Sequence, residues 1–392
     1  MTPPPIRLPP LVEPGPELSA QETARYARHL LLPQVGGLGQ RRLAAARVLV
    51  VGAGGLGSPV LQYLAAAGVG TLGIVDDDVV EVSNLQRQVL HAGSEPGRRK
   101  VDSAAGALRR VNPHVAVLTH PVRLSRDNAL DLLSGYHLVL DGSDSFATRY
   151  LVSDACALLG IPDVWGSVLG FDGQLSVFWA RHGPTYRDLH PQPPPAGSVP
   201  SCAQAGVFGA LCGVIGSAMA GEALKLVTGL GEPLVGRVLL HDALAGSWQT
   251  VRLRRAPDAP PITELVDYEA WCGTVAGIDQ PAGIGRRDGI SAAELARMLA
   301  EREAGRDDFD LVDVREPAER ALLAIPASVP VPMADFESGA ALHRLPDGRR
   351  VVLYCQSGIR SARALGLLRA AGRADATHLD GGVLAWATLA RP

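Results

Sequence analysis

Two short stretches of this 392-residue chain carry side chains that could do chemistry. In the first, the strand-like sequence RVLVVG leads into a loop with Gly52, Gly54, Gly55 and Gly57. Glycines at this spacing after a strand let the backbone approach phosphate, and the amides of the following helix N-terminus point at it. The loop alone would suit any dinucleotide-binding enzyme, so the residues that follow it decide the chemistry.

Polar residues after the glycine loop favour a nucleoside triphosphate. Asp76 ends the next strand, where a carboxylate accepts hydrogen bonds from ribose hydroxyls. Asn84, Arg87 and Lys100 follow, and such a clamp is useful when charge develops on a departing pyrophosphate. Asp144, in a loop after HLVLD, could hold Mg²⁺ between phosphate oxygens. Singly, these residues could be solvated surface charges or, for Asp144, a helix cap. Their ordered combination predicts a triphosphate site.

The second stretch, VVLYCQSGIRS, places Cys355 in a loop between a strand and a helix. The loop residues after the cysteine are Gln356, Ser357, Gly358, Ile359, Arg360 and Ser361. Inward-pointing amides, the helix N-terminus and the Arg360 guanidinium would favour the thiolate, so the loop predicts a reactive sulfur and a cradle for a sulfate-like donor. The alternative is a buried, inert cysteine.

The other four cysteines indicate no metal site. None of them forms a C-x-x-C pair, so no zinc site can be inferred from spacing. Cys156 and Cys212 lie in apolar helical patterns and are expected in the core, whereas Cys202 is as consistent with a structural thiol as with a reactive one. Cys272 has no assigned role. An odd number of cysteines and no recognisable leader predict a cytoplasmic location.

Composition argues against two classes of partner. The formal net charge of -3 gives no electrostatic reason to expect a nucleic acid. Residues 203–221 are uncharged over nearly the length of a membrane span, but they are rich in Gly and Ala and no second such span exists. We therefore expect a buried helix and no membrane contact. Only Lys100 and Lys225 are lysine, which suggests a particular use for a compact ammonium at Lys100.

Strand-like and helical stretches alternate after Arg47, and Ser19 and Glu22 form a capping box that begins a helix before them. The alternation predicts an α/β fold with a doubly wound, mostly parallel sheet and a ligand at the carboxyl ends of its strands. A second, smaller α/β unit follows. We expect a disordered proline-rich tail (1–17), a nucleotide-binding domain (18–255), a linker (256–288) and a C-terminal domain (289–392).

The front domain resembles the MoeB/ThiF family of ubiquitin-activating-like adenylyltransferases. The resemblance is carried by RYARHLLLPQVG, the stretch from GAGGLG to VSNLQRQ, DGSDSFATRYLVSDAC and VPSCAQAGVFG. It implies a Rossmann-type fold and a homodimer. It also implies that ATP and Mg²⁺ convert the C-terminal Gly-Gly carboxylate of a small ubiquitin-like sulfur-carrier protein, of the MoaD/ThiS kind, into an acyl-adenylate.

The resemblance also implies individual roles. Asp76 would bind ribose, Asn84, Arg87 and Lys100 the phosphates, and Asp144 the metal. Arg28, in RYAR, resembles the arginine that family members donate across the dimer interface into the partner's ATP site. Cys202 resembles a family cysteine with a resolving or acyl-linking role.

The chain departs from the family at one place. Many members bind zinc through two C-x-x-C pairs, one before the proline-rich loop and one after the last strands. Here Thr185-Tyr186-Arg187-Asp188 stands at the first position, and residues 256–262 contain no cysteine. We therefore predict that the protein binds no zinc.

The C-terminal region resembles a rhodanese domain through VDVREP, the Cys355 loop and HLDGGVLAW. The resemblance implies that Cys355 carries a persulfide. Gln356 stands where such loops often have arginine, which leaves the choice of sulfur donor, thiosulfate or a cysteine desulfurase, open. Together the two domains predict an adenylyltransferase and sulfurtransferase that makes a thiocarboxylate for molybdopterin or another thiolated product.

Two alternatives remain at this stage. The first is an NAD-dependent oxidoreductase with an unrelated sulfurtransferase tail, which would need NAD rather than ATP. The second is a non-catalytic scaffold whose rhodanese module only binds the carrier. Retention of Cys355 argues against the scaffold.

Overall fold

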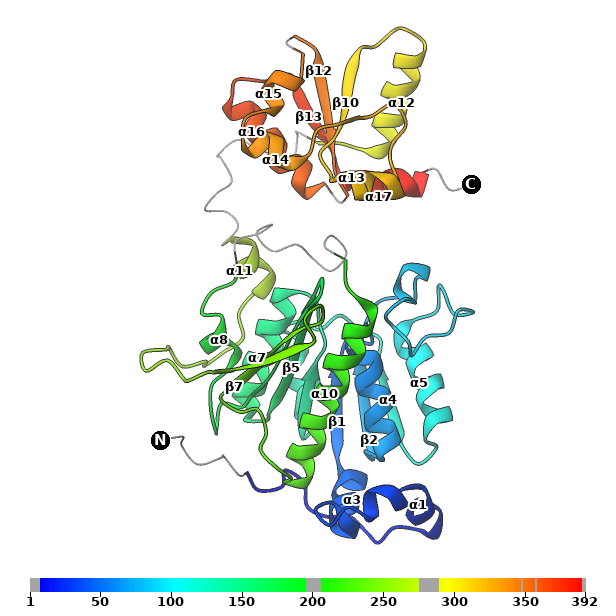
Figure 1. Cartoon of the computed structure of the whole chain (residues 1–392), viewed down its shortest axis with the longest axis vertical. Coiled ribbons are helices and arrows are strands. Elements are labelled where there is room, and N and C mark those ends of the chain that lie inside the picture. Colours follow the sequence, from blue (N-terminus) through cyan, green and yellow to red (C-terminus); the bar gives the residue numbers. More distant parts are fainter. Residues whose placement is uncertain (1–7, 195–205, 275–288, 347, 357, 390–392) are drawn as a thin grey trace. The chain divides into compact units, whose positions relative to one another are not determined.

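A computed structural model describes residues 8–194, 206–274, 289–346, 348–356 and 358–389. They form two compact units, one made by residues 8–194 and 206–273 and the other by residues from 289 onwards (Figure 1). Each unit has its own sheet and its own core.

The first unit is built on an eight-stranded sheet. Its strands are β1 (Arg47–Val51), β2 (Thr71–Val75), β3 (Ala116–His120), β4 (Leu138–Asp141), β5 (Asp163–Leu169), β6 (Asp172–Phe178), β7 (Arg237–Asp242) and β8 (Ser247–Arg252). Their order is β3-β2-β1-β4-β5-β6-β7-β8. The strands from β3 to β5 pair in parallel, and β6, β7 and β8 extend the sheet antiparallel. The predicted doubly wound, mostly parallel sheet is confirmed.

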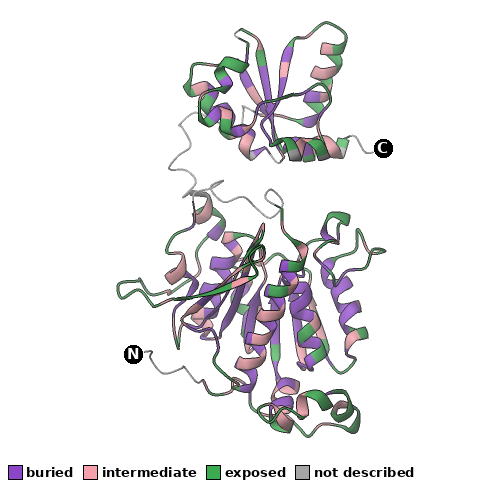
Figure 2. Ribbon diagram, in the orientation of Figure 1, coloured by how far each residue is buried: buried purple, intermediate pink, exposed green. Residues whose placement is uncertain are grey.

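Helices cover both faces of this sheet: α4 (Gly57–Ala67), α5 (Lys100–Val111) and α10 (Gly209–Thr228) share one core with it, and α6 (Ala129–Ser134) and α7 (Phe146–Leu159) share the other. The unit also contains α1 (Ala20–Arg25), α2 (Ala27–Leu30), α3 (Gly36–Ala45), α8 (Tyr186–Leu189), α11 (Tyr268–Thr274) and a 3-10 turn η1 (Val82–Asn84). In β1, Val48 and Val50 belong to a core shared with α4, α5 and α10, whereas Leu49 and Val51 belong to one shared with α6 and α7. Strand alternation therefore fills two hydrophobic layers, and Figure 2 shows the central strands between them as buried.

The long apolar helix α10 belongs to the core of the first unit. By length and composition it could cross a membrane, and 56% of its most apolar window is buried inside the structure. Leu211, Ile215 and Met219 pack in the same core as α4. This placement agrees with the buried helix expected from the sequence.

Two regions expected to lack structure are ordered in part. Residues 1–7 lie outside the described residues, but residues 8–17 follow the surface of the first unit. The Leu11 amide donates to Leu226 O at 3.0 Å, and Arg41 donates to Gly15 O at 2.7 Å. The disordered tail predicted for 1–17 therefore does not extend through residues 8–17.

The predicted linker, 256–288, is also shorter in the structure, because it contains α11. Tyr268, at the start of α11, is 4% exposed and donates to the buried carboxylate of Asp154 at 2.6 Å. The ring of Trp271 lies under the guanidinium of Arg187, 4.6 Å from ring centroid to Cζ. These contacts attach residues 268–271 to the first unit.

The second unit has a five-stranded parallel sheet in the order β11-β10-β12-β13-β9. Its strands are β9 (Gly289–Ile290), β10 (Phe309–Asp313), β11 (Val329–Pro330), β12 (Arg350–Tyr354) and β13 (Ala376–Leu379), and its helices are α12 (Ala292–Glu303), α13 (Pro317–Leu322), α14 (Met333–Glu337), α15 (Ala341–Arg344), α16 (Ile359–Ala370) and α17 (Gly382–Leu389). Val351 and Leu353 face one core while Val352 and Tyr354 face the other, so β12 is buried on both sides and ends at Cys355.

Candidate nucleotide pocket and thiol loop

The glycine loop joins β1 to α4 in very little space. Gly52 has a φ of +89°, a left-handed conformation that favours glycine. A Cβ atom at Gly57 would lie 1.9 Å from the carbonyl oxygen of Gly52, and one at Gly55 would lie 2.8 Å from Cys212 Sγ. Glycine at 57 lets the start of α4 lie directly against the loop backbone, and glycine at 55 lets the loop approach Cys212 on α10.

Asp76, just after β2, holds the loop in place. Its Oδ2 accepts a hydrogen bond from the Ala53 amide at 2.8 Å, and its Oδ1 accepts one from the Asp78 amide at 2.9 Å. Burial raises the pKa of the Asp76 carboxyl, and the nearby Lys100 ammonium opposes that rise. A carboxylate has about four acceptor positions, so two remain for ribose hydroxyls.

Lys100 is the first residue of α5 and is only 6% exposed. Its Nζ lies 2.7 Å from Asp78 Oδ2, whose own side chain is 68% exposed. A buried ammonium needs a partner, and the exposed Asp78 carboxylate supplies one. An incoming phosphate oxygen could replace the Asp78 carboxylate as the partner of Lys100. The exposed Asp78 side chain could then turn to solvent, so that no protein charge is left buried without a partner.

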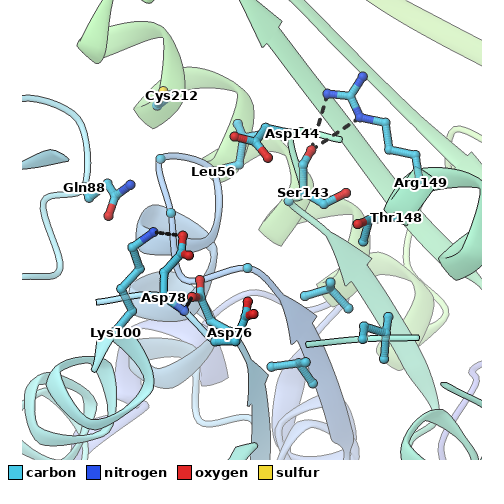
Figure 3. Close-up of a pocket in the computed structure, with 18 of the residues that line it drawn as sticks. Leu56, Asp76, Asp78, Gln88, Lys100, Ser143, Asp144, Thr148, Arg149 and Cys212 are labelled. Atoms are coloured by element: carbon cyan, nitrogen blue, oxygen red, sulfur yellow. Dashed lines mark hydrogen bonds and ion pairs between the residues drawn. The ribbon is translucent and has the colours of Figure 1, made fainter. Parts of the chain in front are cut away.

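These side chains line one cavity of about 350 Å³ (Figure 3). The sequence-predicted residues in its wall are Gly52, Gly54, Gly55, Asp76, Arg87, Lys100 and Asp144. They come from the loops that follow β1, β2 and β4, from the turn after η1 and from the start of α5. The cavity therefore lies at the carboxyl ends of the parallel strands, as expected for a doubly wound sheet.

Three predicted site residues lie elsewhere. Gly57 is buried in the first turn of α4. Asn84 is 8% exposed, and its Oδ1 accepts from the Glu81 amide at 3.2 Å, which closes the turn before Arg87. Arg28 is exposed on α2. Asn84 thus supports the segment that carries Arg87 and is not part of the cavity wall.

Arg149 is a cavity residue that sequence reasoning missed. It is 8% exposed, and its Nε and Nη2 each lie 3.3 Å from the carbonyl oxygen of Ser143. The guanidinium also lies 5.9 Å from the ring centroid of Trp165. Figure 3 shows it beside Ser143 and Asp144, across the cavity from Lys100. Its only signal in the sequence was the stretch DGSDSFATRY, in which it follows Asp144 closely.

The cysteines of the first unit differ in burial and in their distance from the cavity. Cys156 and Cys212 are buried, as predicted, and Cys212 also lines the cavity. Cys272 is half-buried in α11. Cys202 lies outside the described residues, so its suggested reactivity stays a prediction.

In the second unit, Cys355 is fully buried at the end of β12. Its Sγ accepts a hydrogen bond from the Gly358 amide at 3.1 Å and one from Ser361 Oγ at 3.6 Å. Gly358 has a φ of +94° and caps α16. Ser357 and the side chain of Ile359 lie outside the described residues. In the described part of the loop one amide and one hydroxyl thus donate to the sulfur, and the predicted cradle for a sulfate-like donor stays a prediction.

The charges around this loop differ from the expectation. Arg360 was expected to add positive potential, but its Nη1 and Nη2 bind the Glu319 carboxylate at 2.7 and 2.5 Å. A second guanidinium, that of Arg315, donates to Gln356 Oε1 at 3.0 Å and to Asp313 Oδ2 at 2.8 Å. Each of these two guanidiniums is therefore paired with a carboxylate, and Cys355 is still among the groups that raise the pKa of Arg360, after the hydrogen bond to Glu319.

Residues 185–188, at the position of the family's first zinc-binding pair, form a hydrogen-bonded clasp. Thr185 and Asp188 form a capping box at the start of α8, and Asp188 Oδ1 also accepts from the Ala256 amide at 2.8 Å. Arg187 donates through Nε and Nη2 to the buried carboxylate of Asp154. These donors do not fit zinc, because neither segment offers a cysteine pair.

Comparisons with known proteins agree with this geometry. A model of the ThiF family matches residues 26–261, and a model of the rhodanese-like domain matches residues 291–389. The chain is 51% identical over 389 residues to the "Probable adenylyltransferase/sulfurtransferase MoeZ" of Mycobacterium tuberculosis, covering 98% of each chain. It is 43% identical to "Adenylyltransferase and sulfurtransferase MOCS3" of Mus musculus over 98% of this chain and 89% of that one.

A third relative matches the first unit alone. The "Sulfur carrier protein adenylyltransferase" of Thermus thermophilus is 54% identical over 264 residues, which covers 64% of this chain and 97% of the relative. Among solved structures, E. coli MccB with ATP superposes with a TM-score of 0.54 at 18% identity, over 62% of this chain and 74% of that chain. At this identity the likeness shows the fold alone.

Proposed function

This chain belongs to the ThiF family, and from that membership we propose that its first unit activates the C-terminal carboxylate of a sulfur-carrier protein while its second unit supplies the sulfur. The chain is an enzyme, an adenylyltransferase and sulfurtransferase. The observation that carries the proposal is the joint presence of the triphosphate cavity and the Cys355 cradle in one polypeptide.

The first reaction forms an acyl-adenylate. A carrier carboxylate oxygen attacks the α-phosphorus of ATP, the bond to the pyrophosphate oxygen breaks and pyrophosphate leaves. Lys100, Arg87 and Arg149 line the cavity and would bind the negative charge that develops on the leaving group. Asp76 would accept from the ribose, and the glycine loop would approach the phosphates.

Mg²⁺ fits the donor set of this cavity. Asp144 is exposed in the cavity wall, and no described residue forms a hydrogen bond or ion pair with its carboxylate. A free carboxylate beside phosphate oxygens is the kind of oxygen ligand that Mg²⁺ prefers. When bound there, Mg²⁺ would neutralise charge on the phosphates. Asp144 would be its protein ligand.

The second reaction transfers sulfur. The terminal sulfur of a Cys355 persulfide attacks the carbonyl carbon, AMP leaves and an acyl disulfide forms between carrier and Cys355. Two thiols then supply two electrons: the first attacks Cys355 Sγ and releases the thiocarboxylate, and the second reduces the resulting mixed disulfide, leaving the two thiols joined as a disulfide and Cys355 as a thiolate. Donors directed at Sγ from Gly358 and Ser361 would stabilise the thiolate that is regenerated. Thiosulfate or a cysteine desulfurase would reload it, in the cytoplasm.

A homodimer would complete the ATP site. Arg28 is exposed on α2 and does not line the cavity of its own chain, so its side chain is free to bind ATP in the cavity of a second copy. Mixing Arg28→Ala with Lys100→Met protein tests this, because only a mixed dimer contains one intact site. Re-equilibrated equal mixtures should recover about a quarter of wild-type exchange activity. No recovery in a mixture shown to contain mixed dimers would rule out donation of Arg28 across the interface.

The proposal is tested by separating the two reactions. With a Gly-Gly-ended carrier, the protein should catalyse carrier-dependent exchange between ATP and pyrophosphate, and mass spectrometry should show sulfur replacing a terminal oxygen once a sulfur donor is added. Cys355→Ala should abolish the second result and keep the first. ATP left unconsumed with every such carrier would refute the adenylation step. The oxidoreductase alternative, which would require NAD, is not supported by any of these relatives.

A further inference from the structure

One residue of the glycine loop, Ala53, is held through both its backbone N–H and its backbone carbonyl. Its amide donates to Asp76 Oδ2 at 2.8 Å, and its carbonyl oxygen lies 2.9 Å from Nε2 of His91. His91 is 6% exposed and no role has been assigned to it so far. The imidazole therefore lies directly against the loop that would approach the phosphates of ATP.

The contacts continue from His91 toward the surface. Nδ1 of His91 lies 2.7 Å from Ser103 Oγ, and Ser103 Oγ lies 2.6 Å from Glu95 Oε2. Ser103 is fully buried, while the Glu95 side chain is 13% exposed and pairs with Arg98 at 2.6 Å. Ser103 lies one turn after Lys100 on α5, so the same helix end supplies the buried ammonium and this chain of contacts.

The number of available hydrogens limits the protonation states of the linked side chains His91, Ser103 and Glu95. Three contacts join Ala53 O, His91, Ser103 and Glu95, and each hydrogen bond needs its own proton. A neutral imidazole has one N–H and a serine hydroxyl has one O–H, so together they supply two. If Ser103 donates to an ionised Glu95, then both nitrogens of His91 must donate, one to Ser103 and one to Ala53.

We propose that His91 is a positioning residue for the glycine loop, and that the His91–Ser103–Glu95 chain binds one proton more than neutral imidazole and serine supply. The extra proton makes His91 an imidazolium that holds the Ala53 carbonyl and places positive charge beneath the bound phosphates. The part that concerns ATP rests on the proposed function, whereas the proton count does not.

The charged groups around His91 set the pH range in which the extra proton is lost. The pKa of His91 lies below its ordinary value: burial lowers it most, the hydrogen bond to the Ala53 carbonyl raises it, the Lys100 ammonium lowers it further, and the carboxylates of Asp76 and Glu95 raise it. As pH rises the proton is lost, one hydrogen bond must break, and the loop loses an anchor and a positive charge. Affinity for ATP should therefore be greatest on the acid side and fall as His91 deprotonates.

The direct test uses the full chain with ¹⁵N-labelled histidine, without ATP. As pH rises, His91 should pass from a form with both nitrogens protonated to one with a single N–H, and the midpoint should lie below the ordinary histidine value of about 6.5 because the pKa is lowered. Ser103→Ala should shift that transition to lower pH, because Nδ1 loses its acceptor. A His91 that stays a neutral tautomer throughout, with wild-type contacts intact, overturns the proposal.

The functional test compares His91→Gln with His91→Asn, and His114→Gln serves as an exposed control. Gln can still donate to Ala53 O but cannot be charged, whereas Asn reaches only toward Ser103. On the acid side, at about pH 5, we expect the ATP dissociation constant to rise by about threefold for Gln and about tenfold or more for Asn. The dissociation constant of His91→Gln divided by that of wild type should approach one as pH rises, because wild-type His91 then also becomes neutral. Taking this ratio cancels the titration of ATP itself.

A ratio that does not change with pH would overturn the proposal. If no variant and no wild-type protein bound ATP, the proposed function would fail while the ¹⁵N titration still decided the proton count.

Discussion

The Glu319 carboxylate binds both terminal nitrogens of Arg360, at 2.7 and 2.5 Å, beside the loop that carries Cys355. The two side chains are 22% and 24% exposed. The Glu319 carboxylate is therefore an anion close to the place where a dianionic donor such as thiosulfate would bind. Because the two opposite charges lie side by side, the Glu319 carboxylate cancels most of the attraction that the Arg360 guanidinium would otherwise exert on thiosulfate.

We therefore expect Glu319→Gln to favour thiosulfate as the donor. Freed from its carboxylate, Arg360 should lower the KM for thiosulfate by roughly threefold, and the effect should shrink with added salt. Steady-state sulfurtransferase assays measure it. Glu337→Gln, which breaks the exposed pair with Arg363, is the matched control and should change nothing. A higher KM for thiosulfate in Glu319→Gln would show instead that the pair holds the loop in its active shape.

The two lysines of the chain should differ sharply in importance. Lys100 is buried in the cavity wall, whereas Lys225 forms an ion pair with Glu222 on α10, away from the cavity. Lys100→Met should reduce carrier-dependent ATP–pyrophosphate exchange by about 10²-fold or more, because a fixed cation aimed at the leaving group is removed. Lys225→Met should retain exchange activity. Equal losses in both variants at equal thermal stability would contradict the role given to Lys100.

Sequence alone could predict the parts of the site that are local. The glycine loop and Asp76 stand in a strand–loop–helix–strand order that fixes where they end up, and the alternating strands predicted the sheet that carries them. Asn84 was placed among the phosphate ligands because its type and spacing fit. In the structure its side chain bonds to the Glu81 amide three residues earlier, a local alternative that competes with any ligand.

The remaining parts depend on contacts between distant segments. Tyr268 reaches Asp154, 114 residues away, so no local pattern distinguished α11 from a linker. The Leu11 amide likewise donates to the Leu226 carbonyl on α10, and the proline-rich composition of this segment did not predict that contact. Arg149 was missed because its place five residues after Asp144 is a weak signal among many arginines, and only the fold puts it across the cavity from Lys100 (Figure 3).

The clasp at residues 185–188 should stabilise the first unit without metal. Arg187 binds the buried Asp154, so Arg187→Met would leave that carboxylate with Tyr268 as its one remaining side-chain partner among the described residues. We expect a loss of about 3 kcal/mol in the free energy of unfolding, measured by urea denaturation. Arg181→Met, a change outside the clasp, is the control. In addition, elemental analysis should find no stoichiometric zinc, and a chelator should not lower the melting temperature; one tightly bound zinc per chain would refute this prediction.

Two buried carboxyl groups should make the first unit less stable as pH rises. Asp163 and Asp141 lie on neighbouring strands, and neither oxygen of Asp163 has a hydrogen-bond partner among the described residues. Burial raises the pKa of Asp163 well above its usual range, and the Asp141 carboxylate raises it further. The folded state therefore keeps a proton that the unfolded chain loses above about pH 4, so stability falls from that pH upward until the folded group ionises.

Asp163→Asn removes this titration while keeping the shape of the side chain. The variant should unfold at a higher temperature than wild type near pH 7, by at least about 2 °C, which corresponds to about 1 kcal/mol in a unit of this size. The gain in melting temperature should shrink toward pH 4.5, because the Asp163 carboxyl of wild type is then protonated more often in the unfolded chain as well as in the folded state. Asp258→Asn, at an exposed position, should show neither effect. Calorimetry across this pH range decides the matter, because a gain that is constant with pH would point to packing rather than to a bound proton.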